Sequence, residues 1–96
     1  MEIEENLSTH REAILAAARK HGAYNVRVFG SVARGEAGPE SDIDFLVNLE
    51  AGRSLMDLAR LLRELQSLLD RNVDIVTEAG LRPRIRPQVL REARVL

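Results

Sequence analysis

The sequence of 96 residues contains no cysteine, no tryptophan and only three aromatic residues. Without cysteine the chain can form no disulfide, no thiolate nucleophile and no zinc–thiolate site. So few aromatic side chains do not make a surface on which single-stranded nucleic acid stacks its bases. The apolar runs span only a few residues, whereas a membrane-spanning helix needs roughly 20. We therefore expect a cytoplasmic protein that binds no membrane and does not bind nucleic acid directly.

Lysine is almost absent too, and this excludes a large class of nucleotide-binding proteins. The only lysine is Lys20, so no glycine-rich loop ends in Gly-Lys-Ser or Gly-Lys-Thr, and no G-x-G-x-x-G occurs either. The net charge is −1, but arginines gather near the C-terminus, where Glu92 is the only acid among them. These arginines are Arg82, Arg84, Arg86, Arg91 and Arg94. Such a cluster is usually a solvated face, and a surface for a partner or a phosphate is the alternative.

Hydrophobic periodicity predicts alternating helices and strands. Leucines recur at spacings of three and four between residues 55 and 69, which is typical of a helix with one buried face. The predicted elements, in chain order, are a helix over 7–21, a strand over 25–29, a helical turn over 31–34 that ends at Gly35, a strand over 41–49, a helix over 54–70, a strand over 72–76 and a helix over 88–95. This order implies one α/β domain over residues 1–96, with a small mixed sheet and flanking helices.

Two aspartates interrupt the strand predicted over residues 41–49, and they form the first part of a candidate site. Asp42 and Asp44 stand two residues apart among apolar neighbours. Both carboxylates therefore point to one face of the strand, roughly 7 Å apart at their Cα atoms. Aspartate is a poor strand former, and like charges on one face repel each other. Because this arrangement costs stability twice, it indicates a compensating cation, and a divalent metal is the obvious candidate.

A third aspartate, Asp74, stands between apolar neighbours in the strand predicted over residues 72–76. If the two strands are neighbours in the sheet, their spacing of about 4.8 Å lets Asp74 meet Asp42 and Asp44. Such carboxylates suit Mg²⁺, which prefers oxygen ligands, keeps several waters and takes substrate phosphate oxygens as further ligands. Two such ions about 3.5–4 Å apart can activate an attacking hydroxyl and stabilise a leaving pyrophosphate.

The turn after the first predicted strand has the features of a phosphate site. Gly30 has no Cβ, so a phosphate can approach its backbone. Ser31 offers a hydroxyl and opens the helical turn, whose free N–H groups favour an anion. Arg34, one turn further on, could place its guanidinium against a phosphate. A metal on one strand and a phosphate turn upstream of it together suggest a bound nucleoside triphosphate.

These residues resemble one known family. Gly30-Ser31, ten intervening residues and then Asp42-Ile43-Asp44 match the G-S-x(10)-D-x-D signature of the DNA polymerase beta-like nucleotidyltransferases. The stretch ARGEA followed by SDIDFLV is most similar to the minimal, single-domain branch of that superfamily. VDIVT around Asp74 resembles the strand of this branch that carries the third carboxylate. The resemblance implies the polymerase beta-like nucleotidyltransferase fold for essentially the whole chain.

What the resemblance implies for the site follows residue by residue. Asp42 and Asp44 would bind both metal ions. Asp74 would complete the shell of the catalytic ion and assist deprotonation of the acceptor hydroxyl. Gly30 and Ser31 would hold the triphosphate. Arg34 also matches an arginine of the minimal branch.

The resemblance also implies a partner. Members of this branch are commonly antitoxins paired with a HEPN-type ribonuclease toxin, and they silence the toxin by transferring AMP from ATP to one of its tyrosines. The resemblance therefore implies a Mg²⁺-dependent protein adenylyltransferase, with ATP as its substrate and a toxin protein as its partner.

Other interpretations are open. Asp42 could be a turn residue and Asp44 an edge-strand charge that discourages aggregation, although this leaves Asp74 and the Gly30-Ser31 spacing unexplained. The chain could also be a binding module that neutralises its partner by occlusion, with the arginine-rich segment as the contact. The acceptor could finally be a small hydroxylated compound such as an aminoglycoside, although a second domain to enclose it is not apparent.

Overall fold

The structure, a computed structural model that describes residues 2–96, is organised around one mixed sheet. Its elements, in chain order, are α1 (Ile3–Thr9), α2 (Arg11–Lys20), β1 (Ala23–Phe29), β2 (Ile43–Leu49), α3 (Leu55–Leu69), β3 (Val73–Thr77), α4 (Arg86–Glu92) and β4 (Arg94–Val95). The strand order is β3-β2-β1-β4. β2 and β3 run parallel, whereas β1 is antiparallel to both of its neighbours. The expectation of an α/β protein with a small mixed sheet is therefore confirmed.

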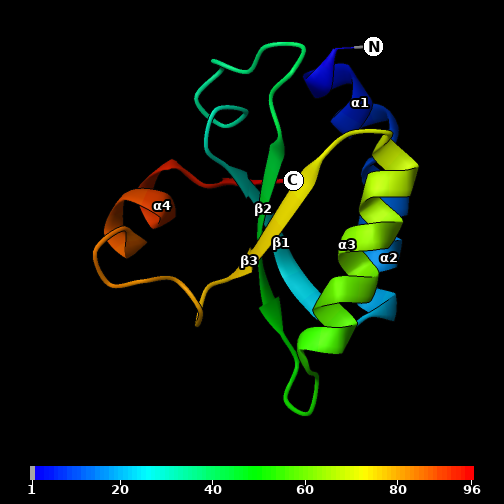
Figure 1. Ribbon diagram of the computed structural model, residues 1–96, viewed down its shortest axis with the longest axis vertical. Helices are drawn as coiled ribbons and strands as arrows, with labels where there is room; N and C mark the ends of the chain where they lie inside the picture. The colour runs from blue at the N-terminus through cyan, green and yellow to red at the C-terminus, as the bar shows by residue number, and fades with distance from the viewer. Residues whose placement is uncertain (1) are drawn as a thin grey trace.

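Helices cover the two faces of the sheet unequally (Figure 1). α1, α2 and α3 lie together on one side of the strands, and α4 lies alone on the other. α3 is the crossover that connects the parallel strands β2 and β3. Within residues 2–96, no helix is both long and apolar enough to cross a membrane.

The alternation of side chains along β2 divides the sheet into its two faces. Ile43 and Phe45 are fully buried in the main core, which lies between the sheet and α1, α2 and α3. Leu46 points the other way and packs in a smaller cluster with Leu81 and Val89, beneath α4. Full burial of one large apolar side chain contributes about 1.5–3 kcal/mol. The main core therefore fixes the register of β2, and the small cluster fixes α4.

The helix predicted over residues 54–70 is α3, and it is confirmed to within one residue at each end. Ser54 is its N-cap, and Ser54 Oγ accepts a hydrogen bond from Met56 N at 3.2 Å. The Asp57 carboxylate accepts a hydrogen bond from Ser54 N at 2.9 Å. This capping box satisfies N–H groups that would otherwise have no partner, so the helix begins where its cap residues stand.

The single helix predicted over residues 7–21 is wrong, because this segment belongs to two helices. α1 and α2 meet at His10, whose φ of −102° and ψ of 9° break the helix. The bend lets Ile3 join the main core from one helix while Ile14 joins it from the other. Periodicity over a window of this length does not detect a bend at one residue.

The predicted strands are present, with ends shifted by one or two residues. β1 begins at Ala23 rather than at residue 25, and Asn25, with a φ of 52°, forms part of a bulge in its pairing with β2. β3 covers Val73–Thr77 rather than residues 72–76. Only the start of β2, at Ile43, changes the surroundings of a candidate site residue.

The C-terminal helix predicted over residues 88–95 is corrected at both ends. α4 begins at Arg86 and includes Pro87 in its first turn, where the missing N–H of proline costs no hydrogen bond. It ends at Glu92, and β4 follows and pairs with the free edge of β1. A strand this short has no periodicity of its own, so only its tertiary pairing reveals it.

We expect the Ser54→Ala protein to lose about 1 kcal/mol of unfolding free energy, because α3 loses its cap. Urea denaturation measures the loss. Ser67→Ala is the matched control, since Ser67 is exposed in the interior of the same helix and alanine is the better helix former there. The control should be neutral or slightly stabilised, and equal losses in the two variants would contradict the capping role.

Candidate active site

Two of the predicted aspartates, Asp44 and Asp74, lie side by side in the sheet. Asp44 is the direct partner of Asp74 in the parallel pairing of β2 with β3. Partners on neighbouring strands project from the same face, with the strands about 4.8 Å apart. Because Leu46 packs beneath α4, Asp44 two residues earlier lies on that same face, opposite the other three helices (Figure 1). The condition on which Asp74 could meet the other aspartates, that the two strands are neighbours in the sheet, is therefore met.

Asp42 is placed differently from the expectation. It was expected within the strand, but β2 begins at Ile43, so Asp42 is an exposed residue at the end of the preceding loop. Ile43 N donates to Asn72 O at 3.1 Å, which is the first hydrogen bond that ties this strand to the segment leading into β3. Asp42 thus stands beside the strand pair and is more exposed to solvent than Asp44.

The negative charge at this end of the sheet is not balanced. Asp44 is half-buried, and burial, followed by repulsion from Asp74 and Asp42, raises the pKa of Asp44 above its ordinary value. Glu92 adds to this rise, whereas Arg34 opposes it. A cation bound near Asp44 would relieve the repulsion.

The donor set suits Mg²⁺, although the side chains are not gathered into a complete metal site. Within residues 2–96, no group of three or more His, Cys, Asp or Glu side chains is close enough to hold an ion by itself. Mg²⁺ needs fewer protein ligands than that, because it keeps waters and takes phosphate oxygens of a bound nucleotide. Asp42, Asp44 and Asp74 therefore fit as partial ligands of a metal–nucleotide complex rather than as a closed metal cage.

The turn after β1 lies directly against the Asp44 carboxylate. Gly30 has a φ of 74°, in the left-handed region, and a Cβ at this position would collide with Oδ2 of Asp44. The predicted helical turn follows: Arg34 N donates to Gly30 O at 3.1 Å, and Gly35, with a φ of 73°, ends it. Ser31 is half-buried at its first position. The fold thus brings together a turn with the features of a phosphate site and a half-buried carboxylate.

The donors of this turn are bound to a carboxylate that sequence reasoning did not single out. Glu92, the last residue of α4, accepts a hydrogen bond from Gly30 N at 3.0 Å. Both of its carboxylate oxygens also accept from Arg34 Nη1, each at 3.2 Å. Arg34 Nε donates to Glu36 at 2.6 Å, and this hydrogen bond, with that to Glu92, raises the pKa of Arg34. The guanidinium is therefore held between two acids.

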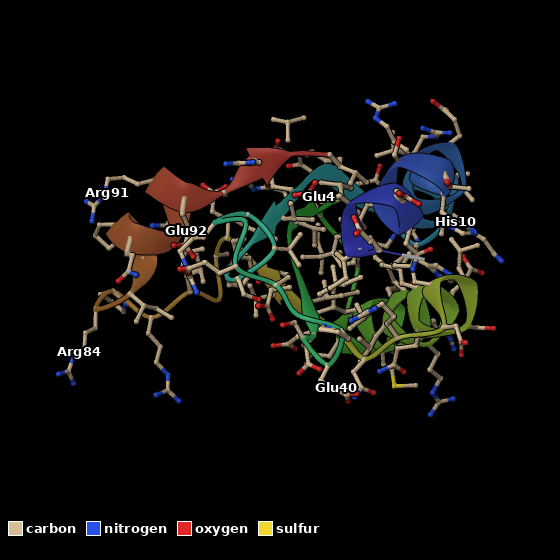
Figure 2. All side chains as sticks on the ribbon, turned by 90° about the horizontal axis from the view of Figure 1, so that it is seen from above. Glu4, His10, Glu40, Arg84, Arg91 and Glu92 are labelled. Atoms are coloured by element: carbon tan, nitrogen blue, oxygen red, sulfur yellow. The ribbon has the colours of Figure 1, made fainter. Side chains whose placement is uncertain are left out.

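Figure 2 shows how α4 presents its charged residues. Arg84 and Arg91 extend into solvent at one end of the molecule, whereas Glu92 lies on the side of α4 that faces the loop after β1. One signal in the sequence marked Glu92, since it is the only acid among the C-terminal arginines. The sequence could not reveal its partners, because they lie 62 and 58 positions away.

A second residue that sequence reasoning missed, Arg71, holds the loop before β2. Arg71 Nη2 donates to the carbonyl oxygen of Pro39 at 2.6 Å and to that of Ser41 at 3.1 Å. Arg71 stands between α3 and β3. It therefore ties the loop that carries Asp42 to the base of the strand that carries Asp74.

Two surface cavities flank this loop. One of about 480 Å³ is lined by polar side chains, among them Asp42, Asp70 and Arg71. The larger one, of about 530 Å³, lies between the loop and α1, and none of the three candidate aspartates lines it. Asp44, Asp74 and Gly30 line neither cavity. The candidate site is therefore defined by the carboxylates and the turn after β1, not by either cavity.

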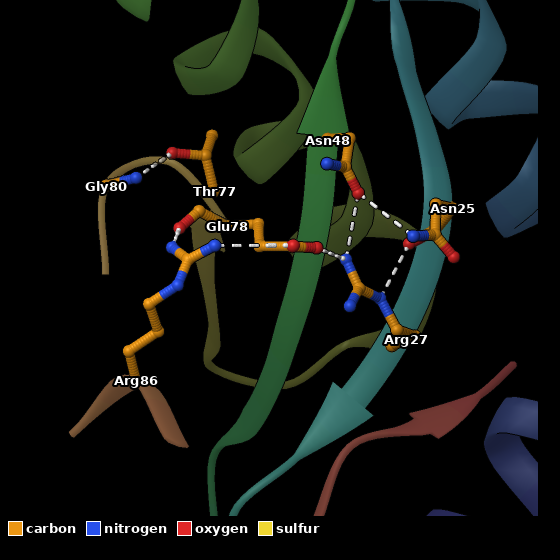
Figure 3. Close-up of polar contacts among 7 residues, drawn as sticks. All are labelled: Asn25, Arg27, Asn48, Thr77, Glu78, Gly80 and Arg86. Atoms are coloured by element: carbon orange, nitrogen blue, oxygen red, sulfur yellow. Dashed lines mark hydrogen bonds and ion pairs between the residues drawn. The ribbon is translucent and has the colours of Figure 1, made fainter. Parts of the chain in front are cut away.

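A network of polar contacts fixes α4 to the sheet (Figure 3). Glu78 joins Arg27 of β1, at 2.9 Å, to Arg86 of α4, at 3.5 Å. Asn48 of β2 accepts a further hydrogen bond from Arg27 at 2.9 Å. The hydrogen bond from Arg27 is the largest cause of the lowered pKa of Glu78. Together with the buried Val89, this network holds α4 so that its last residue reaches the turn after β1.

A turn with the features of a phosphate site, in contact with a half-buried carboxylate, is an arrangement that suits the transfer of phosphate-containing groups. Residues 10–96 match the sequence profile of the family described as the nucleotidyltransferase domain. The chain belongs to this family and is a nucleotidyltransferase.

Comparisons with known proteins agree in fold and in class. The protein adenylyltransferase MntA of Thermococcus cleftensis is 38% identical over 91 residues, which cover 95% of this chain and 89% of that protein. A solved structure provisionally described as a minimal nucleotidyltransferase has 59% identity and a TM-score of 0.87, over 96% of this chain and 94% of that one. A toxin–antitoxin crystal structure with AMP-PNP has a TM-score of 0.75 over 88% of this chain and 69% of that one, but at 24% identity it shows only the fold. The resemblance to the minimal nucleotidyltransferases is therefore confirmed.

We expect Asp44→Asn to stabilise the metal-free protein at neutral pH, because folding raises the pKa of Asp44. With a raised pKa the folded state binds more protons than the unfolded state, so wild-type stability falls as the pH rises above about 4. The melting temperature of the variant should therefore exceed that of the wild type at pH 7 and equal it below about pH 4. Thermal unfolding in the presence of a chelator measures both.

Asp57→Asn is the control of opposite sign for this experiment. A backbone hydrogen bond from Ser54 lowers the pKa of Asp57, so the charged form of Asp57 stabilises the fold at neutral pH. The control should therefore melt at a lower temperature than the wild type at pH 7. If Asp44→Asn also melted at a lower temperature than the wild type, repulsion around Asp44 would not destabilise the folded state.

We expect Arg71→Met to loosen the loop before β2, because three carbonyl oxygens, those of Gly38, Pro39 and Ser41, lose their donor. A protease specific for glutamate should cut at Glu40, in this loop, roughly tenfold faster than in the wild type. Arg60→Met is the matched control, since Arg60 is exposed on α3 and touches no part of the loop. Equal cutting of the two variants would refute the clamp.

Proposed function

We propose that the chain acts as a single cytoplasmic domain that transfers AMP from ATP to a tyrosine hydroxyl of a HEPN-type ribonuclease toxin. It would thereby serve as the antitoxin of a toxin–antitoxin pair. The observation that carries the proposal is the contact of Gly30 with the Asp44 carboxylate, beside which Asp74 stands in register. A backbone that a phosphate can approach closely thus lies against carboxylates that can hold a metal ion.

The aspartates take two roles in this proposal. Asp42, Asp44 and Asp74 would hold two Mg²⁺ ions, whose bound charge activates the acceptor hydroxyl and stabilises the leaving pyrophosphate. Asp74, which is exposed beside Asp44, accepts the proton of the acceptor hydroxyl. The oxygen then bonds to the α-phosphorus of ATP, and the bond from that phosphorus to the bridging oxygen of pyrophosphate breaks.

The turn after β1 takes the triphosphate. Gly30 N–H donates to a phosphate oxygen, and the Ser31 hydroxyl adds a second donor. Arg34 supplies a guanidinium, which binds phosphate oxygens in pairs and stays charged at all physiological pH values. These groups orient the triphosphate so that its α-phosphorus faces the aspartates.

A protein acceptor is supported by two comparisons and by the openness of the site. One relative is named a protein adenylyltransferase, and a toxin–antitoxin complex of similar fold was solved with AMP-PNP, an analogue of ATP. Asp42 and Asp74 are both exposed to solvent. A site this open suits an acceptor that brings its own surface, as a folded protein does.

One observation favours a second candidate function. Glu92 occupies donors of the phosphate turn, and the three aspartates do not form a complete metal group within residues 2–96. A nucleotide site of this kind could be weak or unused, and the chain would then neutralise its partner by covering it. No observation favours a small-molecule acceptor of the aminoglycoside kind.

Incubation of the toxin partner with this protein, ATP and Mg²⁺ should add whole AMP units to the toxin. Asp42→Asn and Asp44→Asn should each abolish the addition, because each removes a metal-binding charge without touching the main core. Mass spectrometry of the toxin measures the addition. Glu12→Gln is the control. It removes an exposed carboxylate from α2, which lies on the side of the sheet opposite to α4.

The two candidate functions differ in stoichiometry. An enzyme neutralises the toxin at substoichiometric amounts and loses this ability in Asp42→Asn, whereas an occluding module needs stoichiometric amounts and keeps its effect in that variant. A stable complex without any change of mass would favour occlusion. Transfer that persists in both aspartate variants would remove the proposed mechanism.

A further inference from the structure

Glu92 binds the same donors that a triphosphate would need. Its carboxylate accepts from Gly30 N at 3.0 Å and from Arg34 Nη1 at 3.2 Å. A backbone N–H carries one hydrogen, so it cannot give a full hydrogen bond to two acceptors at once. A nucleotide that binds at this turn therefore competes with Glu92.

We propose that Glu92 is a positioning residue that holds Gly30 N–H and the Arg34 guanidinium in the absence of nucleotide and yields both to the incoming triphosphate. It thereby sets the affinity for the nucleotide. The inference rests on the proposed function only in that the turn after β1 binds the triphosphate.

The surroundings of Glu92 explain why this residue, rather than another acid, has the role. The Glu92 side chain is 17% exposed, whereas that of Glu36, the other acid bound to Arg34, is 60% exposed. A carboxylate with so little access to water needs donors from the protein. Only Glu92 reaches both Arg34 and the backbone of Gly30.

A triphosphate has the means to displace this carboxylate. It carries more charge than a carboxylate and offers several oxygens to the paired donors of a guanidinium. Glu92 also adds to the negative potential around Asp44, so its withdrawal reduces the repulsion that an anionic triphosphate meets there.

The rest of α4 does not depend on the Glu92 contact. Val89 is buried beneath the helix, and Arg86 is bound to Glu78 at the other end of it. The Glu92 side chain can therefore turn away while the helix stays in place, which separates nucleotide binding from unfolding of α4.

Glu92→Gln tests the proposal, because the amide oxygen can still accept from Gly30 N–H while the charge that holds Arg34 is gone. Titration calorimetry with AMP-PNP and Mg²⁺ should give a Kd about fivefold lower than for the wild type, the scale of one partly exposed ion pair. The KM for ATP should fall by the same factor, without a matching rise in kcat. A purely structural role would instead lower the melting temperature and weaken binding.

Glu36→Gln is the matched control, since it also removes an acid from Arg34 but leaves Gly30 untouched. Its Kd should change clearly less than that of Glu92→Gln. If Glu92→Gln does not fold, Glu92→Asp replaces it, because the shorter carboxylate keeps its charge but cannot reach both donors, and binding should again tighten.

The outcomes separate this inference from the proposed function. Unchanged or weaker binding in a folded Glu92 variant would overturn the inference, and so would equal tightening in Glu36→Gln. Either result would leave the proposed function intact if the wild type binds AMP-PNP. A wild-type protein that binds no nucleotide with Mg²⁺ present would overturn the proposed function itself.

Discussion

The pairing of Asp44 with Asp74 across two parallel strands is the constraint on which the rest of the structure depends. Two neighbouring carboxylates repel, and on a flexible loop they would simply move apart. Here they cannot, because Phe45 and Ile75, the next residues of the two strands, are buried in the main core on the other face. A slip of one residue in either strand would exchange these faces, at the cost of burying an aspartate. The main core therefore keeps Asp44 and Asp74 next to each other on the opposite face of the sheet.

The position of the turn after β1 depends on the register of β2 as well. Phe29, the last residue of β1, is the partner of Asp44 in the antiparallel pairing with β2. The chain leaves the sheet at the next residue, so the turn must begin beside the carboxylate. Only a residue without Cβ and tolerant of a positive φ fits there, which is the physical requirement for glycine at position 30. The distance between turn and carboxylate is thus a property of the sheet rather than of the loop that connects them.

The parts of the site that could be predicted are those encoded locally. Asp44, Asp74 and Gly30 stand in short segments whose alternation and spacing show which way side chains point. The placement of Asp42 could not be predicted, because Arg71, which binds the carbonyl oxygens of its loop, stands about thirty positions away. The contacts of Glu92 could not be predicted for the same reason, because they join the C-terminal helix to the turn after β1. The bend at His10 and the short β4 likewise depend on tertiary packing that no local pattern records.

These long-range contacts give the C-terminal segment a part in the site. Glu92 is a local competitor of phosphate, yet it is surrounded in sequence by five arginines that lend this end of the chain a positive field. Such a field attracts a polyanion such as ATP from a distance, whereas a single carboxylate acts only at contact. In the proposed mechanism a triphosphate therefore approaches α4 favourably and meets resistance only at the last step, where it would replace Glu92 at the turn. Glu92 holds Gly30 N–H and the Arg34 guanidinium until the triphosphate replaces it, so these donors stay oriented throughout the exchange. Neither donor is then left without a partner beside the three aspartates.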